Sequence, residues 1–272
     1  MKTQHTPPRG RLYLFCLFIL YLAPIVGHAQ SLEEIANRGT LRVGLAEFVP
    51  WTFTDSDGEL AGFEVEVGRK LAMDMGVDIE FSILELDEIV DAVRAGEIDM
   101  IAAGLAITPA RALRIEFSRP YFQSGATLVS NSRLQPSVSS LEDLDESGNV
   151  IVTVSNTYSA QFAEELFENA EILFVASEAE AEQALISDLA DGGLTSIVDA
   201  TLLAGRHPDA IDMPLAAPIR RSIAGFGVQP GNQSLLNFLN AWTYARTMDN
   251  WLTDRINYWF TGDDPLAASS AR

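Results

Sequence analysis

One cationic side chain stands where it could bind an anion. Thr108 followed by Pro109 predicts the N-cap and first residue of a short helix. Arg111 then falls in the first helical turn, beside backbone N–H groups that have no partner within the helix. A guanidinium group in that position suits a carboxylate. The alternative is a surface arginine that neutralises Glu116 or Asp99.

Residue types that carry enzyme chemistry are scarce. The only cysteine is Cys16, and His207 is the sole histidine after residue 29. No metal-ligand spacing, nucleophile elbow, Walker loop or dinucleotide-binding glycine pattern occurs. His207 lies in a His-Pro-Asp stretch that predicts a solvated loop. We therefore expect no metal, no cofactor and no catalytic residue.

The N-terminal residues predict a secretory signal peptide over residues 1–29. Three basic residues precede an uncharged apolar stretch at residues 12–26, which is short for a membrane span. Gly27 and Ala29 supply the small residues that a signal peptidase reads, so we expect cleavage after Ala29 and a periplasmic location. Cys16 lies inside this segment, so neither a disulfide nor a lipid anchor is expected.

The mature chain is strongly acidic. Residues 1–29 hold three of the 18 basic residues and none of the 38 acidic ones, so 15 basic and 38 acidic residues remain, a net charge of −23. Such a field repels phosphate groups and anionic lipids, and we expect no nucleic-acid partner. It does not show that a ligand is cationic, because dispersed surface carboxylates are its commoner cause. No second apolar stretch could cross a bilayer, so we expect a soluble mature chain.

The order of predicted elements indicates an α/β fold in two units. Strands at residues 40–45, 79–84 and 99–102 alternate with two helices that Gly76 and Gly96 end. Residues 130–140 are rich in Ser, Asn and Pro, and we place a lobe boundary near residue 129. A second, smaller α/β unit follows. Its expected elements are a strand at 150–154, a helix with a Ser177–Glu180 capping box and a strand at 195–198. A further strand-like stretch follows at 223–228.

Several motifs follow one another in the order of a known family. They are Gly62-Phe63-Glu64-Val65-Glu66-Val67, Gly96-Glu97-Ile98-Asp99-Met100-Ile101, Gly104-Leu105-Ala106-Ile107-Thr108-Pro109-Ala110-Arg111 and Phe117-Ser118-Arg119-Pro120-Tyr121. With a closing Trp-Phe-Thr-Gly at residues 259–262, the chain resembles the family 3 bacterial extracellular solute-binding proteins over nearly all of residues 38–262. The first motif alone also fits an ordinary strand-to-helix junction.

The resemblance implies an α/β, two-lobed periplasmic-binding-protein type II fold with a ligand cleft between the lobes. Residues 30–128 and 226–272 would form lobe 1 and residues 129–225 lobe 2, joined by two crossing strands. The implied function is capture of a small polar ligand, an amino acid or a related carboxylate, for delivery to an ABC transporter permease in the inner membrane. Lobe closure would report that the cleft is occupied. We expect a monomer.

The resemblance also implies a ligand site. In lobe 1, Phe48 matches an aromatic residue over the ligand and Leu86 a residue of the cleft wall. Gly104 matches a position that offers backbone groups, and Arg111 matches the clamp for the ligand's α-carboxylate. Trp51 is close by, with core packing as its alternative role.

In lobe 2, residues 155–158 stand where the family has a Gly-Thr-Thr or Gly-Thr-Ser turn, which assigns Asn156, Thr157 and Tyr158 to the site. Asp199, expected at the end of the strand at 195–198, matches the acid that receives the α-ammonium group. Its alternative role is to cap the following helix, through residues 201–202.

Two departures from the family bear on specificity. Ala106 replaces the Ser or Thr whose hydroxyl helps to hold the ammonium group. A missing hydrogen bond to a charged group costs about 1.5–3 kcal/mol, so a standard amino acid would bind roughly ten- to a hundredfold more weakly unless another group substitutes. Asn156 and Tyr158 replace small residues, and Tyr158 would either narrow the cleft or add a phenol donor.

Other activities occur on this fold and remain alternatives. A periplasmic cyclohexadienyl dehydratase would need a carboxylic acid in the cleft to protonate a leaving hydroxyl group, and Asp199 is one candidate. A lytic transglycosylase would need a further catalytic domain, for which we expect no room before Arg272. A sensor input module is disfavoured by the same shortness and by the lack of a membrane span.

Overall fold

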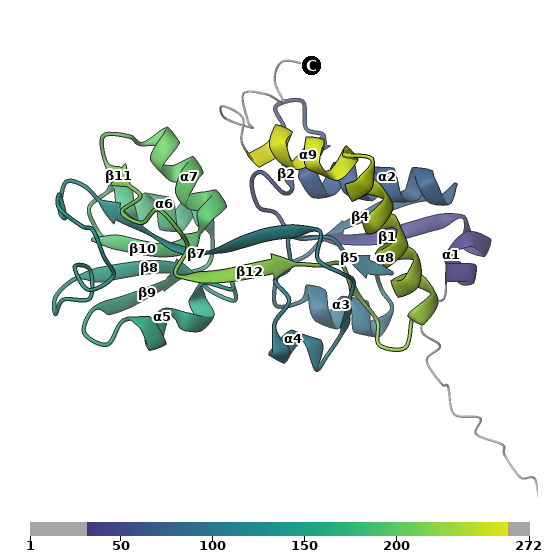
Figure 1. Cartoon of the computed structure of the whole chain (residues 1–272), viewed down its shortest axis with the longest axis horizontal. Helices are drawn as coiled ribbons and strands as arrows, with labels where there is room; N and C mark the ends of the chain where they lie inside the picture. Colours follow the sequence, from purple (N-terminus) through teal and green to yellow (C-terminus); the bar gives the residue numbers. More distant parts are fainter. Residues whose placement is uncertain (1–31, 261–272) are drawn as a thin grey trace, which may run out of the picture.

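The computed structural model describes residues 32–260, so the predicted signal peptide and the last two residues of the Trp-Phe-Thr-Gly motif lie outside the described residues. Two lobes lie side by side, with two long strands running between them (Figure 1). The two-lobed α/β fold expected from the sequence is confirmed. Among the described residues, no helix has the length and apolar character needed to span a membrane.

The first lobe is built on a five-stranded sheet in the order β4-β1-β5-β13-β6. β1 pairs in parallel with β4 and β5, whereas β13 returns late in the chain and pairs antiparallel with β5 and β6. The elements of this lobe are α1 (Leu32–Arg38), β1 (Thr40–Leu45), β2 (Phe53–Thr54), β3 (Leu60–Ala61), α2 (Phe63–Met75), β4 (Asp78–Ile83), α3 (Ile89–Ala95), β5 (Met100–Ile101), α4 (Pro109–Ala112), β6 (Glu116–Phe117), β13 (Gly227–Val228), α8 (Gln233–Met248) and α9 (Trp251–Phe260).

The second lobe is built on a six-stranded sheet in the order β11-β7-β10-β8-β9, with β12 paired to β7. β8 pairs in parallel with β9 and β10, and β7 runs antiparallel to β10. The elements are β7 (Phe122–Asn131), β8 (Val150–Val154), α5 (Ala160–Leu166), β9 (Glu171–Val175), α6 (Glu178–Ile186), β10 (Gly192–Ser196), α7 (Ile197–Arg206), β11 (Ile211–Asp212) and β12 (Arg220–Ala224).

Successive residues of the central strands of lobe 2 pack on opposite faces of the sheet. Leu128 and Ile151 join a buried cluster with Phe167, next to α5, while Val129 and Val152 join another that α6 and α7 supply. This alternation follows from the two-residue period of a strand, and it makes a three-layer lobe with helices on both faces. Lobe 1 likewise has two buried clusters, one containing residues of β1, α2, α8 and α9 and the other residues of α3.

Strands β7 and β12 belong to both lobes. Five residues of each pair antiparallel, from Phe122 opposite Ala224 to Ala126 opposite Arg220. Phe122 and Ala224 are buried in the core of lobe 1, whereas Ala126 is buried in lobe 2. The lobe boundaries at residues 129 and 225 stay a prediction; β7 runs through residue 129, and residue 225 directly follows the end of β12.

Two expected strands differ from the structure by more than one residue at an end. The strand expected at residues 195–198 is wrong at its C-terminal end, because β10 stops at Ser196 and the next two residues open helix α7. Ser196 is the N-cap of that helix, and its side chain accepts a hydrogen bond from the backbone N–H of Asp199. The stretch at 223–228 is split into β12 and β13, which serve different sheets.

Candidate functional site

A cleft with a volume of about 880 Å³ lies between the lobes, and both lobes line it. All ten residues expected at the ligand site line this cleft: Phe48, Trp51, Leu86, Gly104, Ala106, Arg111, Asn156, Thr157, Tyr158 and Asp199. The structure thus brings the expected set together. Their roles toward a ligand stay predictions.

Arg111 reaches across the cleft. Thr108 caps α4 by accepting the backbone N–H of Arg111 at 3.3 Å, with Pro109 in the first turn as expected. The Arg111 guanidinium donates from Nη1 to the carbonyl of Ala106 at 3.0 Å and from Nη2 to the carbonyl of Asn156, in the other lobe, at 3.1 Å. Burial lowers the pKa of Arg111 below its usual value. The group stays charged, and it is held by neutral acceptors rather than by a carboxylate.

The alternative role of Arg111, neutralising Asp99 or Glu116, finds no support in its contacts. Asp99 is buried and pairs instead with Arg42, at 2.9 Å. Glu116 accepts the backbone N–H of Gly231 at 3.2 Å. Both carboxylates therefore have other structural partners.

The turn after β8 has a backbone conformation that asparagine tolerates. Asn156 has a φ of 62°, in the left-handed region that glycine adopts freely and asparagine tolerates best among other residues. The hydroxyl of Thr157 donates to the carbonyl of Val154 at 2.7 Å and accepts from the backbone N–H of Ala160 at 3.2 Å. The turn thereby presents the Asn156 carbonyl to Arg111.

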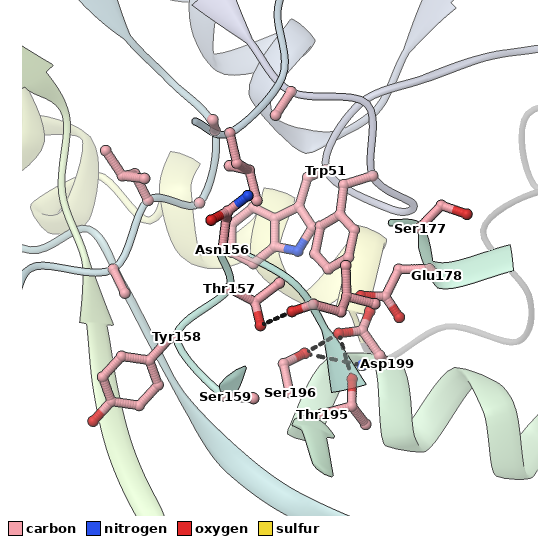
Figure 2. A pocket seen from close by; sticks show the side chains of 18 of the residues that line it. Trp51, Asn156, Thr157, Tyr158, Ser159, Ser177, Glu178, Thr195, Ser196 and Asp199 are labelled. Carbon is pink, nitrogen blue, oxygen red and sulfur yellow. Dashed lines mark hydrogen bonds between the residues drawn. The ribbon is translucent and has the colours of Figure 1, made fainter. Parts of the chain in front are cut away.

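The hydroxyl of Tyr158, expected as a phenol donor for the ligand, is bound to the protein itself. Its hydroxyl donates to the carbonyl of Arg221 on β12 at 2.9 Å, and its ring packs on Phe162 with ring centroids 5.0 Å apart. In Figure 2 its ring points away from Trp51 and Asp199. The phenol therefore ties lobe 2 to a connecting strand, although the residue still lines part of the cleft wall.

Asp199 is buried in the first turn of α7, not at a strand end. Its carboxylate accepts hydrogen bonds from the hydroxyls of Ser196 and of Thr195, the latter at 3.3 Å (Figure 2). Burial raises the pKa of Asp199 to about 6, and the two hydroxyls oppose that shift. Ser196, not Asp199, is the residue that caps the helix. Asp199 therefore presents a fixed carboxylate to the cleft.

Glu178 is a cleft residue that sequence reasoning missed. It is the first residue of α6, directly after the N-cap Ser177, and it lies beside Asp199 in Figure 2. Burial, followed by the neighbouring Asp199 carboxylate, raises the pKa of Glu178 well above its usual value. The capping box identified the helix start correctly, but an acidic residue in a first turn is so common that nothing marked this one as part of the cleft.

Trp51 packs in the core of lobe 1 and also lines the cleft. Its ring lies 4.6 Å from that of Phe122, centroid to centroid, and only 4% of the residue is exposed. The Gly62 motif holds it in place, because a Cβ at Gly62 would lie 2.3 Å from the Trp51 carbonyl oxygen. Gly104 has a φ of +56°, and a Cβ there would lie 3.0 Å from the Trp51 ring. The core-packing role of Trp51 is therefore present together with its position in the cleft.

A buried carboxylate supports the cleft wall behind Trp51. Glu64, the acidic residue of the first motif, is fully buried; one of its carboxylate oxygens accepts the backbone N–H of Gly104 at 2.7 Å and also the hydroxyl of Tyr121. The Gly104 N–H is thus held by the protein itself. Burial raises the pKa of Glu64 to about 7, against the opposing effect of these two donors.

The sequence matches the bacterial extracellular solute-binding proteins, family 3, over residues 41–262. The chain belongs to this family. The motifs on which the resemblance rests position residues of the cleft. Gly62 leaves room for the Trp51 backbone, and Glu64 holds the backbone N–H of Gly104. The Thr108-Pro109 turn positions Arg111.

Three similar proteins show the range of the family. Cyclohexadienyl dehydratase of Pseudomonas aeruginosa is 22% identical over 93% of this chain and 95% of its own length. A probable amino-acid ABC transporter periplasmic-binding protein of Sinorhizobium fredii is 25% identical over 82% of this chain and 74% of its own. The crystal structure of an ancestral amino acid-binding protein, a precursor of cyclohexadienyl dehydratase, has a TM-score of 0.78 at 31% identity, covering 84% of this chain and 99% of that one. Binding proteins and an enzyme thus share this architecture.

The pKa of Glu64 predicts a pH dependence of stability. Between its ordinary pKa of 4.5 and its folded value of about 7, the folded protein holds a proton that the unfolded chain has lost. This contribution to the free energy of unfolding is complete below about pH 4.5 and is lost as the pH rises to about 7, on the order of 3 kcal/mol in total. Glu64→Gln, which cannot titrate, should remove this part of the stability difference between pH 5 and pH 8 in urea unfolding and leave the part that comes from the raised pKa values of Asp199 and Glu178.

The matched control is Glu80→Gln, which changes an exposed glutamate on β4 and should keep the stability difference of the unaltered protein. An unaltered difference in the Glu64 variant would show that other groups are responsible.

The left-handed conformation of Asn156 predicts that two substitutions there affect stability differently. Asn156→Ala should destabilise the protein by about 1 kcal/mol, because alanine loses 1–2 kcal/mol in this region relative to right-handed conformations. Asn156→Gly should change stability by less than about 0.5 kcal/mol and keep the carbonyl that Arg111 contacts. Urea unfolding measures both, and equal losses would show that the asparagine side chain matters instead of its backbone.

Proposed function

We propose that this protein captures an amino acid in the periplasm and delivers it to an ABC transporter permease. The observation that carries the proposal is the charge arrangement of the cleft: Arg111 projects from lobe 1 and Asp199 from lobe 2 into the same space. A guanidinium suits the carboxylate of an amino acid, and a carboxylate fixed by two hydroxyls suits its ammonium group. One zwitterion would bind both lobes at once.

The relatives support this proposal. The protein from Sinorhizobium fredii is described as an amino-acid ABC transporter periplasmic-binding protein, and the ancestral structure is described as amino acid-binding. We propose the same ligand class for this chain. Secretion with cleavage after Ala29 remains part of the proposal, since residues 1–31 lie outside the described structure.

The proposed mechanism is a shift between open and closed arrangements of the lobes. In the structure Arg111 already bridges the cleft through the Asn156 carbonyl. An amino acid would offer Arg111 a charged acceptor and Asp199 a charged donor, so it would favour the arrangement in which both are within reach. A permease could then recognise the closed protein by its shape.

We further propose that the protein acts as a monomer without turnover of its ligand and without nucleic acid. The acidic net charge opposes binding to phosphate groups. The competing proposal is a dehydratase, which the relative from Pseudomonas aeruginosa and the raised pKa of Asp199 both favour, because a protonated carboxyl group can act as a general acid.

The deciding experiment is a thermal-shift screen of the secreted protein against amino acids, amines and small carboxylates that include cyclohexadienyl acids. Calorimetry on the hits then measures the dissociation constant, and chromatography measures whether the ligand is consumed. A raised melting temperature with an intact amino acid supports the proposal. Consumption of a cyclohexadienyl acid would instead support the dehydratase. If no amino acid raises the melting temperature, the proposed function is wrong.

Arg111→Ala should abolish tight binding. Removing one partner of a buried charge pair costs about 2–5 kcal/mol, or a loss of about 30-fold or more in affinity. The control is Arg114→Ala, which lies close by in sequence but pairs with Asp91 on the surface. Calorimetry should show a lower affinity for the amino acid in the Arg111 variant and an unchanged affinity in the Arg114 variant. Equal affinities in the two variants would show that Arg111 does not bind the ligand.

Ala106→Ser should strengthen amino acid binding. The added hydroxyl restores a hydrogen bond to the ammonium group, for about 1.5–3 kcal/mol and a roughly ten- to hundredfold gain in affinity. Ala103→Ser is the matched control, since Ala103 is a similarly buried alanine of the same cleft wall. An unchanged affinity of the Ala106 variant would show that another group already satisfies the ammonium.

A further inference from the structure

Acidic side chains outnumber basic ones in the lining of the cleft. Among the described residues, five acidic side chains and one basic side chain line it: Glu47, Glu85, Asp87, Glu178 and Asp199 against Arg111. Glu47, Glu85 and Asp87 are exposed, so water screens them. Glu178 is half-buried and Asp199 is buried, so the uncompensated charge of these two matters most.

Glu178 has no counter-charge of its own in the described part of the chain. Its carboxylate makes no hydrogen bond or ion pair there. The basic group whose field reaches it is Arg206 of α7, and that guanidinium is bound to Glu182, with Nη1 to Oε2 at 2.7 Å. His207 also contacts Glu182, at 2.6 Å. The guanidinium whose field reaches Glu178 is thus bound to another carboxylate.

A simple zwitterion would leave this charge unpaired. Its carboxylate would pair with Arg111 and its ammonium with Asp199, which balances those two side chains. Glu178 would remain, beside Asp199 and further removed from water when the lobes close. Because an unpaired carboxylate in such surroundings either raises the free energy of the complex or takes up a proton, a ligand with a second positive charge fits the cleft better.

We infer that Glu178 binds a second cationic group of the ligand, so that the protein selects amino acids with an ammonium or guanidinium side chain. This inference rests on the proposed function and deepens it. Glu178 and Asp199 come from different helices, α6 and α7, and each presents one carboxylate to the cleft. The pair can therefore hold two cationic groups of one molecule.

The test compares cationic amino acids with neutral ligands of similar shape. Calorimetry would measure dissociation constants of L-lysine against L-norleucine and of L-arginine against L-citrulline. The unaltered protein should prefer each cationic ligand by more than tenfold, because a charge-assisted hydrogen bond is lost in its neutral counterpart. Glu178→Gln should remove most of this preference and change the affinity for the neutral ligands by less than about threefold.

Glu85→Gln is the matched control, because it removes the same charge from an exposed position of the same cleft. It should keep the preference for the cationic ligands. If Glu178→Gln weakens cationic and neutral ligands equally, Glu178 serves the α-ammonium group and the inference is wrong. If the unaltered protein binds neutral amino acids as well as cationic ones, this inference fails and the proposed function stands. If it binds no amino acid, both fail.

A second measurement needs no variant. Calorimetry at pH 6 in two buffers of different ionisation enthalpy counts the protons released on binding. Because burial raises the pKa of both Glu178 and Asp199, a ligand that places a cation on each should release more protons than one that pairs with Asp199 alone. L-lysine should therefore release more protons than L-norleucine, and equal release would overturn the inference.

Discussion

The pairing of β7 with β12 is the constraint on which the cleft depends. These two strands are hydrogen-bonded along five residues and are buried at one end in the core of lobe 1 and at the other in lobe 2. Ser124 and Gly125 of β7 and Ser222 of β12 line the cleft itself. The lobes can therefore move relative to each other only as far as this two-stranded ribbon bends or twists, which keeps the two walls of the cleft facing each other.

Among the buried and half-buried side chains of the cleft, the sign of charge differs between the two lobes, whereas the exposed Glu47, Glu85 and Asp87 add negative charge to lobe 1. Lobe 1 contributes the guanidinium of Arg111, and lobe 2 contributes the carboxylates of Asp199 and Glu178. Each group is positioned at or near the start of a helix, by Thr108, Ser196 and Ser177 as N-caps. Short polar side chains that accept otherwise unpaired backbone N–H groups also position the charges, so helix capping and the geometry of the cleft are coupled in this fold.

Prediction from the sequence was most accurate where the structure depends on a few neighbouring residues. The Thr108-Pro109 turn and the Ser177–Glu180 capping box predicted the starts of α4 and α6, and the ordered motifs predicted the fold and the residues that line the cleft. It failed at Asp199, because Ser196 ends the strand two residues earlier than its apolar neighbours suggested. It also could not assign Glu64 or Glu178, whose roles depend on partners from elsewhere in the chain: Gly104 is 40 residues from Glu64, and the Asp199 carboxylate lies on a different helix.

The contact between Arg111 and the Asn156 carbonyl also bears on affinity. This guanidinium is partly out of water, and two of its N–H groups donate to backbone oxygens. A ligand carboxylate that replaced the Asn156 oxygen would add only the difference in hydrogen-bond strength between a charged and a neutral acceptor. On the proposed function, these two hydrogen bonds already order the side chain, so little rotamer entropy would remain to be lost when a carboxylate binds. The protein would thus exchange some binding strength for a guanidinium that is already in position.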